Sequence, residues 1–192
     1  DIGVAGPLAG LLATVVVTAI GLWLPPVDVP SWVLNAESAV EVQFNYPPLL
    51  TAIAMAIGEP LSYEDPTKVV NPVVIGGWVG MFVTFLNLIP TGQLDGGHIL
   101  RAILRPAQER IAPLVPLALF GLAGYLYFFT DAGQMMGLWI LWGILAMLAA
   151  TFGSARPIDD SPLDRWRIAI GLFTFFLGVL CFTPVPIQIA SP

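Results

Sequence analysis

The residues best suited to chemistry occur close together, in a stretch that reads TFLNLIPTGQLDGGH from Thr84 to His98. Here an apolar segment carries an amide, Asn87, and then a carboxylate, Asp95, followed by two glycines. Pro90 removes a backbone donor and the glycines permit unusual backbone conformations, so we expect a helix to break at this point. A carboxylate and an amide at a broken apolar helix are candidates for a functional site. The alternative is an ordinary interfacial turn, because Pro, Gly and Asp are common turn residues.

Neighbouring polar side chains leave further alternatives open. Asn87 could be catalytic, or it could hydrogen-bond a neighbouring helix. We interpret His98, the only histidine, as a surface group beside Arg101 rather than a metal ligand. The single cysteine, Cys181, excludes an internal disulfide and thiolate metal clusters.

The elements that position these residues belong to a membrane protein. Of the 192 residues, 57% are hydrophobic and only 10% are charged, whereas soluble domains carry roughly 25% charged residues. So few charges could not cover the surface of a water-soluble domain of this size. The net charge of −6 has the wrong sign for a nucleic-acid-binding protein, so no nucleic-acid partner is expected.

Five apolar segments are long enough, or nearly so, to cross a bilayer as helices, which takes about 20 residues. They are Pro7–Leu24, Val73–Pro90, Ile111–Phe129, Met135–Gly153 and Ile168–Thr183. Leu49–Gly58 is too short to cross and predicts an interfacial or re-entrant helix. The predicted fold is therefore an all-α polytopic membrane helix bundle, with about five transmembrane helices and a broken second span, in a single transmembrane domain over residues 1–192.

The charges between these segments predict the orientation in the membrane. The loop over residues 25–72 has one basic residue, Lys68, beside six acidic residues. The connections after the second and fourth segments carry three arginines each, and the turn around Asp131 carries no basic residue. Cytoplasmic loops are enriched in Lys and Arg. We therefore expect a cell-membrane protein with the N-terminus and the Arg-rich loops in the cytoplasm, and an irregular, extracytoplasmic acidic loop.

Two sequence segments resemble a known family. The stretch from Phe85 to Ala102 is similar to the second signature of the site-2 protease family of intramembrane zinc metalloproteases, in which N-x-x-P leads to an Asp-Gly pair. The opening segment, DIGVAGPLAG, is similar to the start of that family's preceding core helix. The form GQLDGGH resembles the archaeal and chloroplast-type branch.

The resemblance implies roles for two residues. Asp95 matches the family's aspartate zinc ligand, and Asn87 matches an asparagine that steadies the substrate or the oxyanion. The family's H-E-x-x-H motif supplies two further ligands and the general base, but it is absent from this sequence, which has one histidine. We expect that motif in a missing segment upstream of Asp1, so that the chain is a C-terminal portion that would be inactive alone.

The resemblance thus implies an intramembrane zinc endopeptidase that cleaves transmembrane protein substrates by metal-activated water, with Zn²⁺ as cofactor and the lipid bilayer as its surroundings. One alternative is a non-catalytic membrane protein of the same fold that binds transmembrane partners. A more distant alternative is half of a transporter or channel, which predicts a second half with similar Gly and Pro interruptions. No such repeat occurs in these residues.

Overall fold

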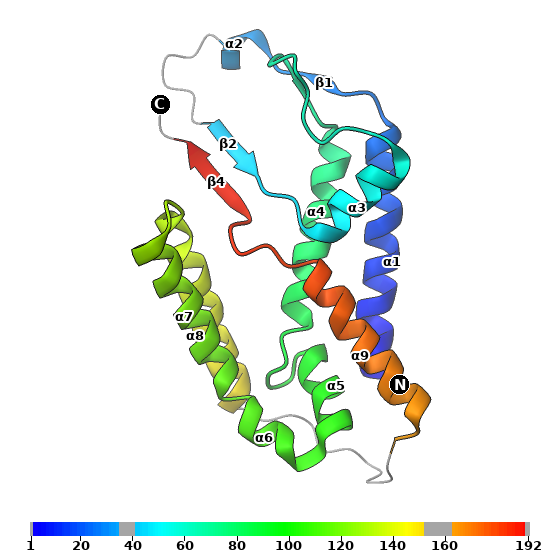
Figure 1. The fold of residues 1–192 in the computed structure, drawn as a ribbon, viewed down its shortest axis with the longest axis vertical. Coiled ribbons are helices and arrows are strands. Elements are labelled where there is room, and N and C mark those ends of the chain that lie inside the picture. The colour runs from blue at the N-terminus through cyan, green and yellow to red at the C-terminus, as the bar shows by residue number, and fades with distance from the viewer. Residues whose placement is uncertain (1, 35–40, 152–162, 191–192) are drawn as a thin grey trace. The chain divides into compact units, whose positions relative to one another are not determined.

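The structure is a computed structural model that describes residues 2–34, 41–151 and 163–190 (Figure 1). This part of the chain is mostly helical, as predicted, and its strands are short. The chain forms two compact units, and each is described by itself below. Unit 1 comprises Asp1–Ala9 and Thr84–Val179, and unit 2 comprises Gly10–Val83 and Leu180–Pro192.

The elements follow one another in an order dominated by helices. The α-helices are α1 (Ile2–Trp23), α2 (Ser31–Leu34), α3 (Pro48–Ile57), α4 (Pro72–Asn87), α5 (Asp95–Leu104), α6 (Gln108–Ile111), α7 (Leu114–Phe129), α8 (Met136–Thr151) and α9 (Arg165–Leu180), and the 3-10 helices are η1 (Arg105–Ala107) and η2 (Gly133–Met135). The strands are β1 (Val27–Asp28), β2 (Glu41–Phe44), β3 (Lys68–Val69) and β4 (Ile187–Ala190).

Each of the five predicted spans contains a helix, although the observed bounds differ from the predicted ones. Among the residues that the structure describes, three helical segments are long and apolar enough to cross a membrane: Gly3–Trp23, Gln108–Phe129 and Gly133–Thr151. Helices α4 and α9 have 16 residues each, which corresponds to about 24 Å. Because a bilayer core is about 30 Å thick, these two helices are shorter than a straight span requires. The predicted end of the fourth span, residues 152–153, lies outside the described residues.

In unit 2, α1 and α4 approach each other closely through small residues. A Cβ added at Gly77 would collide with the Thr18 hydroxyl, and one added at Gly80 would collide with the Thr14 hydroxyl. Gly76, by contrast, lies 3.9 Å from the nearest side-chain atom of Val17 by the same measure. Gly77 and Gly80 therefore lie on the face of α4 that meets α1, where small residues let two helices approach closely.

The predicted short helix is present in unit 2 as α3, within one residue of its expected bounds. Pro48 occupies its first position, where a missing backbone N–H costs nothing. Gly58 ends the helix with φ 85°, and its N–H donates to the Ala54 carbonyl at 2.9 Å. A glycine with positive φ is a common helix terminator.

The acidic loop contains regular structure that the sequence did not predict. β1 pairs antiparallel with β3, and β2 pairs antiparallel with β4. Asn45 directly follows β2 and extends the contact with the segment before β4, because its Nδ2 donates a hydrogen bond to the Val185 carbonyl at 2.8 Å. Trp78 Nε1 of α4 in turn donates to the Asn45 carbonyl at 2.9 Å. The prediction of an irregular loop was therefore wrong in part, because strand partners distant in the sequence satisfy its backbone groups.

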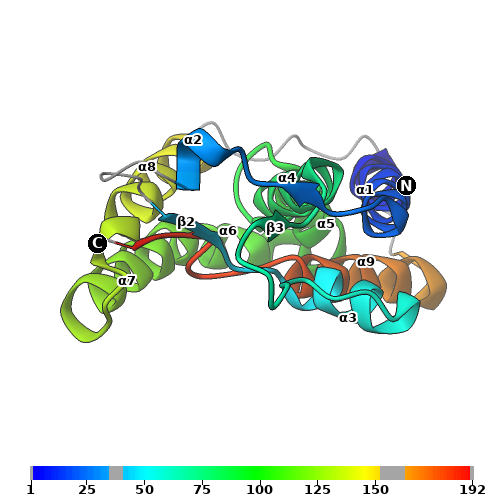
Figure 2. The same ribbon diagram turned by 90° about the horizontal axis from the view of Figure 1, so that it is seen from above.

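Unit 1 contains the candidate site and the helices around it. Helices α7 and α8 lie side by side as a hairpin in both views (Figures 1 and 2), and Gly143 of α8 lies against the ring of Phe120 in α7. Helix α9 packs on α5, since Gly171 faces Ile99 and Ile103. These contacts place α5 inside a helical assembly rather than at an isolated turn.

Candidate functional site

The predicted helix break lies between Asn87, the last residue of α4, and Asp95, the first residue of α5. The Leu88 N–H donates to the Thr84 and Phe85 carbonyls at 3.1 and 3.0 Å, and the Ile89 N–H donates to the Leu86 carbonyl at 3.2 Å. The helix thus tightens and stops three residues before the predicted end at Pro90. The physical reason is that a proline disfavours helical conformation in the residue before it.

The two glycines after Asp95 let the loop of residues 88–94 fold back onto α5. A Cβ at Gly96 would collide with the Leu88 carbonyl, and a Cβ at Gly97 would collide with the Gly92 carbonyl. Such a Cβ at Gly97 would also lie 2.7 Å from the Thr91 carbonyl oxygen. Backbone therefore packs on backbone at this site, which only glycine permits. This contact fixes the loop relative to the first turn of α5, where Asp95 begins the helix.

Asp95 carries a half-buried carboxylate at the start of α5. Its Oδ2 lies 3.5 Å from the position that a Cβ would take at Gly6 of α1. The carboxylate makes no hydrogen bond or ion pair with another residue that the structure describes. A helix N-terminus favours a negative charge. Asp95 is therefore a carboxyl group without a protein partner among these residues, and Gly6 has no side chain beside it.

His98 lies one helical turn after Asp95 on the side of α5 that meets α1. Its Cβ is 3.4 Å from the position of a Cβ at Gly3, and its side chain is half-buried. Gly3 and Gly6 thus face His98 and Asp95 as two antiparallel pairs. The sequence interpretation missed this pair of glycines, and their spacing of three residues was the signal that could have revealed it.

Asn87 is exposed at the end of α4. Its amide makes no hydrogen bond to another described residue, so the alternative role of hydrogen-bonding a neighbouring helix is not observed in this part of the chain. The non-helical residues 88–94 separate Asn87 from Asp95. Asn87 and Asp95 therefore belong to two separate helices rather than to one continuous helix.

The donor set limits what metal these residues can hold. No group of three His, Cys, Asp or Glu residues is close enough to hold a metal ion within the described ranges. A catalytic zinc takes three protein ligands and an open position for water. Asp95, unpartnered and half-buried, fits as one such ligand. The remaining ligands would have to come from residues other than these.

Thr91 is a further buried residue that the sequence interpretation missed. It is completely buried, and its Oγ1 donates to the Ala146 carbonyl of α8 at 3.4 Å. The next residue, Gly92, has φ 53°, and a Cβ there would collide with the Ala149 carbonyl. The loop before Asp95 is thereby held between α5 and α8. The glycine at residue 92 was the sequence signal for this loop conformation, because a positive φ favours glycine.

Residues 1–125 match the sequence model of Peptidase family M50. The chain is 30% identical over 190 residues to "Probable zinc metalloprotease EGY2, chloroplastic" of Arabidopsis thaliana, in an alignment that covers 96% of this chain and 31% of that relative. It is 29% identical over 196 residues to "Probable zinc metalloprotease EGY1, chloroplastic" of Oryza sativa subsp. japonica, which covers 100% of this chain and 31% of that relative.

A third relative extends this group. The chain is 29% identical over 150 residues to "Probable zinc metallopeptidase EGY3, chloroplastic" of Arabidopsis thaliana, which covers 72% of this chain and 24% of that protein. The chain therefore spans less than a third of the length of the curated relatives it matches. No solved structure matches it.

Proposed function

Because the chain belongs to peptidase family M50, we propose that it forms the part of an intramembrane zinc endopeptidase that follows the H-E-x-x-H segment. The observation that carries this proposal is the half-buried, unpartnered carboxylate of Asp95 at a helix break. The relatives' names, which include the words zinc metalloprotease, support the same reaction class. The substrates would be proteins whose transmembrane helices lie in the same bilayer.

In this proposal Asp95 is the zinc ligand that these residues contribute, and an upstream segment contributes the two histidines and the general base. A bound zinc would supply activation of a water molecule for attack on a peptide bond. Asp95 is held for this role by the first turn of α5, whose N-terminal end favours the anionic carboxylate. Gly6 leaves room beside Oδ2 because it has no side chain.

Asn87 is proposed to contact the substrate or the oxyanion. Its exposed amide is the last side chain of α4 and is not committed to another described residue. The carbonyls of a substrate helix are already hydrogen-bonded, so the substrate must unwind before cleavage. Non-helical residues 88–94 lie next to Asn87, and an amide here could hydrogen-bond the backbone groups that unwinding exposes.

The proposal extends to the orientation in the membrane. The Arg-rich connections would face the cytoplasm and the acidic segment of residues 25–72 would face the other side, as the distribution of Lys and Arg suggests. The site would then lie near the cytoplasmic side, because Asp95 is close in sequence to Arg101 and Arg105. Labelling of single cysteines placed at residues 64 and 110 from each side of the membrane would test this.

The deciding experiment compares Asp95→Ala with Asp131→Ala in the longest natural polypeptide that contains these residues. Asp131 is an exposed aspartate outside the α4–α5 region, so it controls for the loss of a carboxylate. We expect Asp95→Ala to lose bound zinc and to cleave a transmembrane reporter at least about 100-fold more slowly, while Asp131→Ala retains both. Equal zinc content and equal cleavage in the two variants would contradict the proposal. A wild-type protein without zinc or cleavage would favour the non-catalytic, partner-binding alternative.

A further inference from the structure

Helix α8 lies beyond residues 1–125, which match the family, yet its buried face contacts the loop that precedes Asp95. The buried residues of α8 are Trp139, Gly143 and Ala146. Their spacing of four and three residues places them along one side of the helix. This side of α8 therefore packs against other residues of unit 1 and is not exposed.

The contacts between α8 and the loop involve the backbone directly. Thr91 Oγ1 donates to the Ala146 carbonyl at 3.4 Å, and Thr91 is completely buried. A Cβ at Gly92 would collide with the Ala149 carbonyl and would lie 2.8 Å from the Ala149 Cβ. Ala146 and Ala149 lie three residues apart, on adjacent turns of one face. Small side chains at these positions let the loop backbone approach α8.

The same loop residues contact the first turn of α5 on their other side. A Cβ at Gly97 would collide with the carbonyl oxygens of Thr91 and Gly92. Gly97 is two residues after Asp95, within the same helical turn. An unbroken series of contacts thus runs from Ala149 through Gly92 and Gly97 to the backbone of Asp95.

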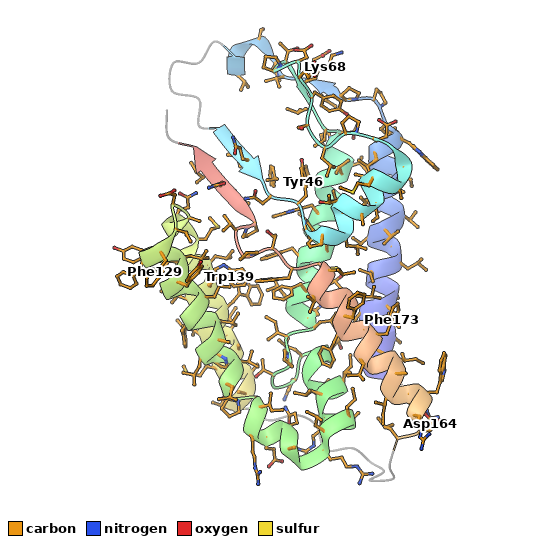
Figure 3. All side chains as sticks on the ribbon, viewed as in Figure 1. Tyr46, Lys68, Phe129, Trp139, Asp164 and Phe173 are labelled. Carbon is orange, nitrogen blue, oxygen red and sulfur yellow. The ribbon has the colours of Figure 1, made fainter. Side chains whose placement is uncertain are left out.

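Trp139 provides a second contact between α8 and the helix break. The side chain, labelled in Figure 3, is completely buried. Its ring meets the ring of Phe85 edge-on, with centroids 6.3 Å apart and an interplanar angle of 81°. Phe85 lies in the last turn of α4, two residues before Asn87. Helix α8 therefore contacts the end of α4 as well as the loop that leads to α5.

We propose that α8 positions the Asp95 carboxylate, and that Thr91 and Ala149 are positioning residues that act through Gly97. The inference rests on the proposed function, in which Asp95 is a zinc ligand. Groups that orient a metal ligand matter because a metal site tolerates little displacement of its ligands, and their loss typically costs about 10–100-fold in metal affinity or activity. A larger side chain at residue 149 would push the loop away from α8 and shift α5.

The test compares Ala149→Leu with Ala118→Leu in the longest natural polypeptide that contains these residues. Ala118 lies on α7 in the same helical hairpin and is exposed, so the added side chain has space there. We expect Ala149→Leu to weaken zinc binding about tenfold or more and to lower kcat in proportion with little change in KM. Hydrogen exchange at the amides of residues 94–98 should accelerate in this variant alone.

A second pair of variants keeps the inference testable if Ala149→Leu does not fold. Thr91→Val removes the hydroxyl while keeping the shape, and Thr91→Ser keeps the hydroxyl. We expect zinc affinity to fall about threefold in the valine variant, because the hydrogen bond is long, and to recover in the serine variant. Unchanged zinc affinity and unchanged exchange in both Ala149→Leu and Thr91→Val would overturn the positioning role. Absence of zinc from the wild-type protein would instead overturn the proposed function, and the exchange data would still report whether α8 holds the loop.

Discussion

The α4–α5 region and the acidic segment of residues 25–72 are held in place by different kinds of contact. Between α4 and α5, carbonyl groups pack directly against glycines of the next helix, with no side chain between them. In the acidic segment, short strand pairs and side-chain hydrogen bonds such as that of Asn45 hold the chain. Direct backbone contacts limit the movement of the α5 turn that carries the Asp95 carboxylate. Hydrogen bonds between exposed strands, by contrast, can be replaced by hydrogen bonds to water.

This comparison predicts that the largest effect comes from adding one methyl group at the α4–α5 region. Gly96→Ala would place a Cβ against the Leu88 carbonyl, and overpacking of this kind costs about 1–3 kcal/mol of unfolding free energy, or more where backbone must move. The matched control is Gly121→Ala on α7, where nothing apart from the neighbouring residues and backbone of the same helix lies within 4 Å of the added Cβ, and a stabilisation of about 0.4–1 kcal/mol is expected. Unfolding in mixed micelles measures both values. Equal stability of the two variants would show that the loop does not press on α5.

An intermediate effect is expected where the acidic segment meets the C-terminal strand. Asn45→Ala removes the hydrogen bond from Nδ2 to the Val185 carbonyl, which is worth about 1 kcal/mol. We expect the amides of β4 to exchange faster with solvent by about fivefold, while those of α5 remain unchanged. Glu59→Gln, an exposed change in the same segment, serves as the control. Acceleration at α5 as well would mean that the two regions are not held independently.

The sequence predicted the parts of this molecule that depend on local chemistry. Pro90 and the glycines after Asp95 determine where a helix stops and starts, so the break between α4 and α5 is confirmed, and only the end of α4 was placed too late. The pairing of β2 with β4 joins residues 41–44 to residues 187–190, and no short-range pattern encodes such a partner. The proximity of Gly6 to Asp95 was missed for a different reason, because the spacing of Gly3 and Gly6 was a short-range signal that was not interpreted.

The predicted roles of Asp95 and Asn87 depend on more than the fold of these residues. The structure shows a carboxylate without a partner among the described residues and an exposed amide, which are properties that spacing alone could not establish. Burial and partners follow from the packing of helices distant in the sequence, here α1 and α8. The chemical roles of both residues stay predictions, and the Asp95→Ala comparison tests the first of them.

The smallest predicted effect concerns the turn at Asp65 in the acidic segment. Asp65 Oδ1 accepts hydrogen bonds from the Thr67 hydroxyl at 2.6 Å and from the Thr67 N–H at 2.9 Å. These bonds, the hydroxyl first, hold the pKa of the Asp65 carboxyl below its ordinary value, and Lys68 adds to the shift while the slight desolvation opposes it. Because the folded pKa lies below the unfolded one, the contribution to stability is present above about pH 4, the ordinary aspartate pKa, and is lost as the pH falls through the folded pKa.

Titration of the Thr67 and Lys68 amides by NMR between about pH 6 and pH 2 would measure this effect. Thr67→Val should raise the pKa of Asp65 toward its ordinary value, because it removes the hydroxyl donor, and Thr67→Ser should keep it low. Since Asp65 is exposed, we expect no measurable change in overall unfolding or at α5. If the pKa of Asp65 in the wild-type protein has its ordinary value, the two hydrogen bonds from Thr67 do not persist in solution. The acidic segment would then be less ordered than its hydrogen bonds indicate.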